Sequence, residues 1–217
     1  MTQRGKFITL EGPEGGGKST QAERLARGIE ERGHRVLRTR EPGGTPTGEL
    51  IRGILQHGKS GEPVSPRTET LLFAASRAQL VQRVILPALA EGRWVVCDRF
   101  ADSTTAYQGC GRGFDRDEIL AINAFAIDGA TPDLTLLLDL EVALGFERLK
   151  ARHAKTATTH DRIEREDREF HERVRAGYRE LAREHPERIR VIDASASADE
   201  VASRVWSAVQ EAFGEQI

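Results

Sequence analysis

A glycine-rich segment that ends in a lysine and a serine carries the clearest chemical signal in the chain. Residues 12–19 read GPEGGGKS and fit the pattern G-x-x-x-x-G-K-[ST]. Glycines let successive backbone N–H groups curl around a phosphate, the lysine adds a compact charge near the β- and γ-phosphate oxygens, and the serine hydroxyl can ligate Mg²⁺. The segment therefore predicts that a nucleoside triphosphate binds here, with Lys18 and Ser19 in these two roles.

Two further pairs of residues could serve the same site. Asp98 and Arg99 directly follow an apolar stretch, so a carboxylate able to reach Mg²⁺ and a guanidinium are expected beside the phosphate loop. Phe73 and Arg77 stand four residues apart in a helical stretch, so an aromatic ring and a planar donor point the same way and could hold a base. Structural alternatives stay open for both pairs: helix capping and a surface arginine for the first, core packing and an ion pair for the second.

Charge, cysteine spacing and hydropathy limit the classes of function. Lys and Arg number 32 against 34 Asp and Glu, so the net charge of −2 provides no overall basic field for a nucleic-acid polymer. Cys97 and Cys110 have no metal-ligand spacing and are interpreted as reduced thiols. No apolar run approaches the roughly 18 to 20 residues that cross a bilayer, and no signal-peptide core is present, so a cytoplasmic protein without a membrane partner is expected.

The elements that must position these residues alternate between strands and helices. Apolar runs predict strands at 7–10, 35–40, 94–97, 134–140 and 189–193. A helix is expected from Ser19, and a longer one from Thr68 to about Leu89, with its inward side formed by Leu71, Leu72, Ala75 and Ala78. This alternation predicts an α/β fold with a five-stranded, mainly parallel sheet flanked by helices, and ligand sites after the first three strands.

The length of 217 residues, with 38% apolar and 30% charged residues, predicts one domain that buries its own core. The small polar run 156–160 lies between two charged helical stretches and predicts a mobile loop that serves as a lid.

The phosphate loop alone leaves the phosphoryl acceptor open, because the acceptor could be water or a second small molecule. No guanine-selecting N-K-x-D tetrad occurs in the sequence, which disfavours a GTPase.

Six segments together resemble the bacterial thymidylate kinases, members of the P-loop nucleoside monophosphate kinase family. They occur in order over essentially the whole chain: EGPEGGGKST (11–20), TREPGGT (39–45), LLFAASR (71–77), DRFADSTTAYQG (98–109), PDLTLLLD (132–139) and DRIE (161–164). The resemblance implies transfer of the γ-phosphoryl group of ATP to dTMP with Mg²⁺, giving dTDP and ADP for dTTP synthesis. It also implies a cytoplasmic homodimer, with a single P-loop kinase domain over residues 1–217 and a lid at about 148–165.

The resemblance assigns the donor and metal roles residue by residue. ATP would be held by Gly12, Pro13, Glu14, Gly15, Gly16, Gly17, Lys18, Ser19 and Thr20. Asp98 is similar to the family's Mg²⁺-proximal acid and would share the metal with Ser19. Glu14 is similar to its loop carboxylate near the 3′-hydroxyl of the acceptor and the metal.

The acceptor roles follow from the same resemblance. Phe73 would stack on thymine while Arg77 hydrogen-bonds the edge of the base. Arg99 would grip the acceptor phosphate with help from Arg40. The remaining acceptor residues would line the monophosphate pocket (Ser103, Thr104), fill the space of a ribose 2′-hydroxyl (Tyr107) or lie beside that ring (Gln108).

The source of a catalytic arginine is expected to be the lid. Gly15 stands where some relatives carry an arginine, so the loop cannot supply the guanidinium. Arg148 and Arg152, on one helical face, and Arg162, within DRIE, are the candidates, and the sequence leaves open which of them reaches the transferring phosphoryl group. With Lys18 and Arg99 they complete the predicted catalytic set.

Two other functions stay as alternatives. The first is another nucleoside monophosphate kinase or a deoxynucleoside kinase, which LLFAASR and DRFADSTTAYQG disfavour. A deoxynucleoside kinase would also need a base for the 5′-hydroxyl proton. The second is a non-catalytic P-loop module that only binds nucleotides, which the presence of Lys18, Ser19 and Asp98 disfavours.

Overall fold

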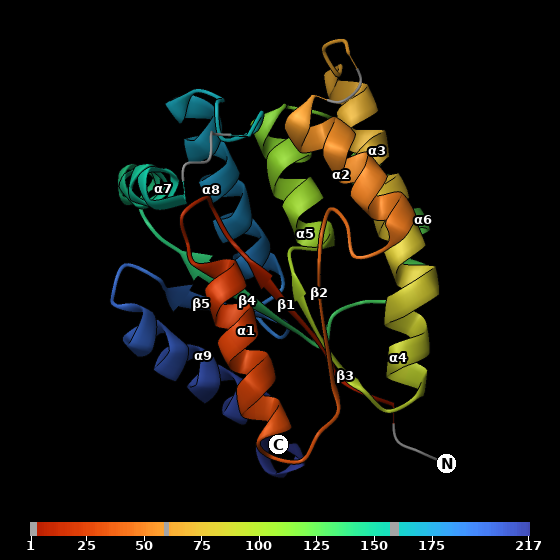
Figure 1. The fold of residues 1–217 in the computed structure, drawn as a ribbon, viewed down its shortest axis with the longest axis vertical. Coiled ribbons are helices and arrows are strands. Elements are labelled where there is room, and N and C mark those ends of the chain that lie inside the picture. Colours follow the sequence, from red (N-terminus) through yellow and green to blue (C-terminus); the bar gives the residue numbers. More distant parts are fainter. Residues whose placement is uncertain (1–3, 59–60, 157–160) are drawn as a thin grey trace.

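A parallel β-sheet forms the centre of the protein in the computed structural model, which describes residues 4–58, 61–156 and 161–217. In this described part the sheet has five strands in the order β2-β3-β1-β4-β5 (Figure 1). The strands are β1 (Phe7–Glu11), β2 (Val36–Arg40), β3 (Trp94–Asp98), β4 (Leu134–Asp139) and β5 (Ile189–Asp193), and every neighbouring pair is parallel. The predicted sheet is confirmed, and each predicted strand is correct to within one residue at either end.

Helices cover both faces of this sheet. On one face α1 (Lys18–Glu30) packs against α9 (Ala198–Phe213), and strand residues such as Ile8 and Leu10 pack beneath them. Phe7 points to the opposite face, where the apolar core is completed by the long helix after residue 66. This alternation follows from the two-residue side-chain period of a strand. Burial on both faces makes the three central strands β3, β1 and β4 mostly apolar, whereas the edge strands β2 and β5 carry arginines and exposed positions.

The first helix begins in a way that leaves its N-terminal amides available. Gly17 precedes α1 with φ of 80°, a left-handed conformation that glycine adopts without strain, and it provides no side-chain cap. The predicted apolar side of this helix is confirmed by four buried residues, namely Ala22, Leu25, Ala26 and Ile29. The apolar side of α1 therefore holds the helix in place, while its first turn has no side-chain cap and can offer its N–H groups to an anion.

The long helix contradicts part of the sequence prediction. It runs as α3 (Pro66–Leu80), continues through a π-helical segment, η1 (Val81–Ile85), and ends as α4 (Leu86–Ala90). Leu71 is 59% exposed and Ala75 is also exposed, so the predicted inward side is wrong. The buried side instead carries polar residues that find partners, such as Ser76, whose hydroxyl accepts a hydrogen bond from the Gly43 N–H.

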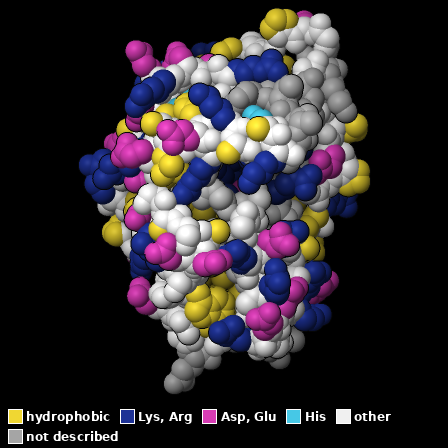
Figure 2. All heavy atoms as spheres, turned by 60° about the vertical axis from the view of Figure 1, so that its left-hand side comes forward, with side chains coloured by type: hydrophobic (Ala, Val, Ile, Leu, Met, Phe, Trp, Pro, Cys, Tyr) yellow, Lys and Arg dark blue, Asp and Glu magenta, His cyan; other side chains and the backbone are white. Residues whose placement is uncertain are grey.

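The remaining elements complete the layers. They are α2 (Pro46–His57), α5 (Ala101–Thr104), the π-helical η2 (Thr105–Gly111), α6 (Arg116–Ile127), α7 (Val142–Thr156), α8 (Arg168–Glu184) and η3 (Gly214–Gln216). None of the described helices is long and apolar enough to span a membrane. On the face drawn in Figure 2, basic and acidic side chains are interspersed rather than segregated.

One close backbone contact joins the fold to the phosphate loop. Gly145 of α7 lies so near the loop that a Cβ atom at this position would stand 2.4 Å from the carbonyl oxygen of Glu14. No alanine can occupy that position unless the loop or the helix moves, because real Cβ atoms do not approach backbone so closely.

We expect Gly145→Ala to lower the free energy of unfolding by about 1–3 kcal/mol, the usual cost of overpacking. Urea-induced unfolding followed by circular dichroism measures the change. Gly109→Ala is the matched control, because a Cβ there would meet only Ile119 at 3.9 Å. That variant should keep or slightly raise the stability, and equal losses in both variants would contradict the proposed contact.

Candidate functional site

The ends of β1, β2 and β3 open into one polar cavity of about 460 Å³, called here the phosphate cavity. Lys18 and Ser19 enter it from the loop after β1, Arg40 from the end of β2, and Asp98 and Arg99 from the end of β3. The structure therefore brings together the residues that the sequence placed after the first three strands. This position agrees with the rule that parallel sheets bind ligands beyond the C-terminal ends of their strands.

Charged side chains dominate the lining of this cavity. The six cationic side chains are Lys18, Arg40, Arg52, Arg99, Arg148 and Arg152, and the five acidic ones are Glu14, Glu41, Asp98, Asp161 and Glu164. Glu14 pairs with Arg99 and Glu164 with Arg152, which orients these two arginines. The excess of cationic donors suits a ligand with several phosphate oxygens.

The phosphate loop is closed by its own lysine. Lys18 Nζ donates hydrogen bonds to the carbonyl oxygens of Gly12 at 3.0 Å and Pro13 at 2.8 Å, and the side chain is 7% exposed. Burial, together with the nearby positive charge of Arg99, lowers the pKa of Lys18 to about 8. Gly12 is required at its position, because its φ is 134° and a Cβ would meet the Leu138 carbonyl oxygen at 2.3 Å.

Ser19 and Asp98 place two oxygen ligands side by side at the mouth of the loop. The Ser19 hydroxyl donates to Asp98 Oδ2 across the gap between the phosphate loop and β3. The described residues contain no cluster of three or more His, Cys, Asp or Glu side chains that could hold a metal alone. Mg²⁺ commonly takes only one or two protein oxygens and completes its shell with water and phosphate, so this pair fits Mg²⁺ bound together with a nucleotide.

Arg99 connects the phosphate loop to the next wall of the site. Its backbone has φ of 71°, a left-handed conformation that is strained for a residue with a side chain. Nη2 donates to Glu14 Oε1 at 2.6 Å and to the Tyr107 hydroxyl at 3.1 Å, while Nη1 donates to the Gly12 carbonyl oxygen at 3.2 Å. The unusual backbone thus turns a strand-end arginine back across the loop.

Glu14 is the counter-charge of this arginine. Burial alone would raise its pKa, but the charges of Arg99 and Lys18 lower the pKa of Glu14 to about 2. The Tyr107 hydroxyl also donates to Glu14 Oε1, at 2.8 Å. Glu14 is therefore ionised at neutral pH and ties the loop to η2.

Glu11 supports the same arrangement from beneath and was missed in the sequence prediction. This wholly buried carboxylate accepts hydrogen bonds from the Phe100 N–H, from both the N–H and the hydroxyl of Ser103, and from the Tyr178 hydroxyl. Burial, with a contribution from the charge of Asp102, raises the pKa of Glu11 to about 7. The sequence does contain a signal for this role, because Glu11 is an acidic residue at the end of a mostly apolar strand.

A second cavity adjoins the phosphate cavity and is called here the acceptor cavity. It brings together five of the predicted acceptor residues: Phe73, Ser103, Thr104, Tyr107 and Gln108. Glu14 and Arg99 line both cavities, so the two spaces meet at these side chains. An aromatic ring on one wall and polar groups on the others suit a base joined to an anion.

Arg77 differs from its expected role. The side chain is only 1% exposed, and the described lining of the acceptor cavity does not include it. Its guanidinium donates to Glu41 Oε2, to Asn123 Oδ1 and, at 2.8 Å, to Thr104 Oγ1. In this structure Arg77 fixes Thr104 from behind the cavity wall, because its donors are engaged by buried acceptors rather than directed at a base.

The three lid arginines point in three directions. Arg148 donates to the carbonyl oxygens that follow β5, at 2.7 Å for residue 194 and 2.8 Å for residue 195. Arg162 turns away from both cavities toward the carbonyl oxygen of Leu55 at 3.1 Å. Arg152 lines the phosphate cavity, where its Nη2 donates to Glu164 Oε1 at 2.7 Å. The predicted mobile loop at 156–160 lies mostly outside the described residues, which omit 157–160.

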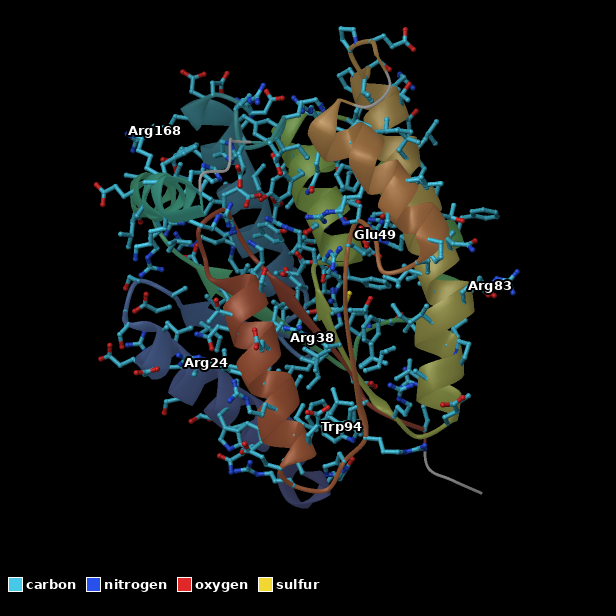
Figure 3. The ribbon with its side chains drawn as sticks, in the orientation of Figure 1. Arg24, Arg38, Glu49, Arg83, Trp94 and Arg168 are labelled. Carbon is cyan, nitrogen blue, oxygen red and sulfur yellow. The ribbon has the colours of Figure 1, made fainter. Side chains whose placement is uncertain are left out.

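Two residues of α2 and a third cavity were not predicted. Arg52 donates to the Pro42 carbonyl oxygen at 2.9 Å and lines the phosphate cavity, while Gln56 lines both this and the acceptor cavity. Burial and the neighbouring charge of Arg40 lower the pKa of Arg52. No motif marks α2, which follows the loop after β2. Glu49 lies in its first turn (Figure 3) and accepts a hydrogen bond from Arg40.

The third cavity, of about 300 Å³, lies on the other side of the phosphate loop and is called here the base cavity. It is bounded by glycines 15–17, by Thr20 and Gln21 of α1, by Arg148 and by the loop after β5, including Ala194 and residues 196–198. The wall after β5 was not predicted, because residues 194–198 are all small and belong to no motif.

Known proteins with similar sequences share one description. A family model described as thymidylate kinase matches residues 10–205. The chain is 51% identical over 205 residues to the thymidylate kinase of Solidesulfovibrio magneticus, covering 94% of this chain and 98% of that protein. It is 47% identical over 208 residues to the thymidylate kinase of Deinococcus radiodurans, covering 96% and 98%. The solved structure of thymidylate kinase from Ehrlichia chaffeensis superposes with a TM-score of 0.77 at 33% identity, covering 95% of this chain and 99% of that one.

We expect Lys18 to take up protons when a nucleoside triphosphate binds above about pH 8, because the phosphate anions raise its lowered pKa. Affinity should accordingly be highest below this pH and fall as the pH rises through it. Calorimetric titration in buffers of different ionisation enthalpy measures the uptake. Lys18→Arg keeps its charge throughout this range and is the control. Equal proton uptake by the two proteins would contradict the assignment to Lys18.

Proposed function

The chain belongs to the thymidylate kinase family, and from this premise we propose that it transfers the γ-phosphoryl group of ATP to dTMP, producing dTDP and ADP. The observation that carries this proposal is that the phosphate and acceptor cavities meet at Arg99 and Glu14. A donor held by the loop after β1 and an acceptor held against Phe73 would bring their phosphates together at this point. Residues 1–217 act as one kinase domain in this proposal.

The donor occupies the phosphate and base cavities. The loop from Gly12 to Thr20 holds the phosphates of ATP through its backbone N–H groups and Lys18, and adenine enters the base cavity. Arg148 forms one wall of that cavity and is itself fixed by the carbonyl oxygens that follow β5. We therefore assign Arg148 to donor binding rather than to the transferring phosphoryl group.

Ser19 and Asp98 would hold Mg²⁺, their two oxygens being adjacent. When bound, Mg²⁺ neutralises charge on the phosphates of the donor.

The acceptor occupies the second cavity. Phe73 stacks on thymine, while Ser103, Thr104 and Gln108 surround the nucleoside. Arg99, helped by Arg40, holds the acceptor phosphate. Tyr107 is fixed by Glu14 at 2.8 Å, so its ring is held rigidly where a ribose 2′-hydroxyl would have to fit. Arg77 contributes indirectly through Thr104.

The chemistry requires orientation of charges and no general base. A phosphate monoester has its second pKa near about 6, so the acceptor is largely a dianion at neutral pH and is already nucleophilic. The obstacle is the repulsion between two anions that must approach in line, and fixed cations reduce it. Lys18, Arg99 and Arg152 supply these cations from three different elements. Arg152 is the lid residue we assign to the transferring phosphoryl group, because it alone of the lid candidates lines the phosphate cavity without being held by the loop after β5.

Part of the lid is already docked on the acceptor cavity. Asp161 and Ile163 line that cavity, and Asp161 Oδ1 accepts from the N–H groups of Ile163 and Glu164 at 2.9 and 2.8 Å. The position of Asp161 and Ile163 on the cavity wall supports the proposal that the segment at about 148–165 closes over the substrates.

We also propose that the protein is a homodimer. Exposed apolar residues lie on α3 and on the two helices that pack against it, α2 and α6: Leu50 is 75% exposed, Leu71 59%, Leu120 42% and Phe125 88%. A second copy that covered this surface would remove apolar area from water. Cys97 and Cys110 are both free, which supports a reducing compartment and hence the cytoplasm.

The function is tested by ADP release with ATP and Mg²⁺ and a panel of acceptors: dTMP, dUMP, dGMP, AMP, CMP, thymidine and none. Release that depends strongly on dTMP is expected. Release with AMP or CMP instead would contradict the acceptor assignment, and release without an acceptor would indicate an ATPase.

Arg152→Ala is expected to lower kcat by about 10³-fold or more, while the KM values change little, because an arginine at the transferring phosphoryl group is worth that much in related chemistry. Steady-state kinetics with both substrates measure the change. Arg148→Ala is the matched comparison on the same helix and should mainly raise the KM for ATP. A near-normal kcat in Arg152→Ala would show that this arginine does not reach the phosphoryl group.

A further inference from the structure

Glu69 is a wholly buried carboxylate on α3 that has no part in the roles proposed above. Three side chains converge on it from other segments. Gln108 Nε2 donates to Oε1 at 2.7 Å, Arg112 donates from Nε and Nη2 at 3.2 and 3.0 Å, and Arg162 Nη2 lies 2.5 Å from Oε2. Such partners are needed, because an unpaired charge in a protein interior is very costly.

The ionisation of Glu69 decides which way the Gln108 amide faces. Burial alone would raise the pKa of Glu69, but hydrogen bonds from Arg112 and Gln108 and the charges of Arg112 and Arg162 lower it below its ordinary value. An ionised carboxylate can only accept hydrogen bonds. Gln108 must therefore turn its NH₂ group toward Glu69, since the carbonyl end of the amide would face another acceptor.

The opposite end of the amide belongs to the acceptor cavity. Gln108 lines that cavity together with Phe73, and among the described residues its side chain makes one hydrogen bond, through Nε2 to Glu69. Oε1 is then the polar atom that Gln108 offers to a base lying against Phe73.

We propose that Glu69 is a positioning residue for base selection. It fixes the Gln108 amide so that Oε1, a hydrogen-bond acceptor, faces the base, and the site then favours bases that carry an N–H on that edge. This inference rests on the function proposed above. Thymine and uracil carry a donor at N3, whereas N3 of cytosine is an acceptor. A site built to hydrogen-bond an N–H strongly rejects an analogue that lacks it, because the buried group of the site is left unpaired.

The same carboxylate also contacts the lid. Arg162 belongs to the lid segment, and Arg112, which donates to Glu69, lies 2.7 Å from Glu166 just beyond it. A substitution at Glu69 can therefore disturb lid contacts as well as the amide, and the test must separate the two effects.

Glu69→Gln is the first variant, because a glutamine at this position can pair with Gln108 in either orientation. We expect the ratio of kcat/KM for dTMP to kcat/KM for dCMP to fall about tenfold or more. The ratio for dTMP over dUMP should stay unchanged, because both bases carry N3–H, and the KM for ATP should stay unchanged as well. Lid damage alone would affect all acceptors alike and would leave every acceptor ratio as it was. An unchanged ratio of dTMP to dCMP overturns the proposal.

The double variant Glu69→Gln with Gln108→Glu reverses the pair. The glutamine at 69 then donates to the carboxylate at 108, whose second oxygen again faces the cavity as an acceptor. We expect most of the lost preference for dTMP over dCMP to return. A double variant no more selective than Glu69→Gln overturns the proposal.

Gln108→Met serves if Glu69→Gln fails to fold, as judged by circular dichroism and thermal unfolding. It removes the acceptor and leaves both arginines on Glu69, so the same loss of preference is expected. A Gln108→Met variant that keeps the preference for dTMP over dCMP overturns the proposal.

Glu184→Gln removes an ion pair with Arg116 outside the cavity and is the control that should keep every ratio. A wild-type protein that releases ADP equally with dTMP, dCMP or no acceptor would refute the proposed function itself. A dTMP-selective wild type with an equally selective Glu69→Gln refutes only this inference.

Discussion

The repulsion between two phosphorylated substrates is the constraint on which the rest of the structure depends. A kinase that joins two anions needs a cation at the place where they meet, and that cation must keep its position before either substrate arrives. Arg99 meets this requirement. Burial alone would lower its pKa, but the charge of Glu14, together with smaller contributions from Tyr107, Tyr178 and Glu11, raises the pKa of this guanidinium well above its ordinary value. It is held by the phosphate loop on one side and by η2 on the other.

Much of the surrounding fold can be understood as support for this arginine. The left-handed backbone at Arg99 costs about 1–3 kcal/mol and persists only where neighbouring structure determines it. Glu11 supplies part of that determination, because it binds the N–H of Phe100 and the hydroxyl of Tyr178 on α8. Tyr178 is 2% exposed and belongs to the same apolar cluster as Ile163 of the lid. The sheet edge, the acceptor wall and the lid are therefore connected through a few buried polar groups.

The sequence predicted the sheet almost completely, because the central strands are buried on both faces, are mostly apolar and end in charged residues such as Asp98. It also predicted which residues line the cavities when a motif marked them, as with Phe73 and Tyr107. It failed where depth or partners decide the outcome. Residue spacing placed Arg77 near Phe73 on the same helix but did not indicate its burial against Glu41 and Asn123. The amphipathic pattern predicted the wrong buried side for α3. Its buried polar residues form hydrogen bonds with partners far away in the sequence, and a local pattern does not show such partners. Arg52 and the loop after β5 were not predicted, because no sequence motif marks them and only the folded arrangement brings them to the site.

In the proposed mechanism Arg99 holds the acceptor phosphate, and calorimetric binding of dTMP and of thymidine to the wild-type protein and to Arg99→Gln measures this contact. The difference in affinity between the two ligands isolates the contribution of the phosphate. We expect Arg99→Gln to reduce this difference by about 2 kcal/mol or more, while thymidine binds as before, because a buried charge-assisted contact is lost. A difference that survives the substitution would contradict the claim and place the phosphate elsewhere in the site.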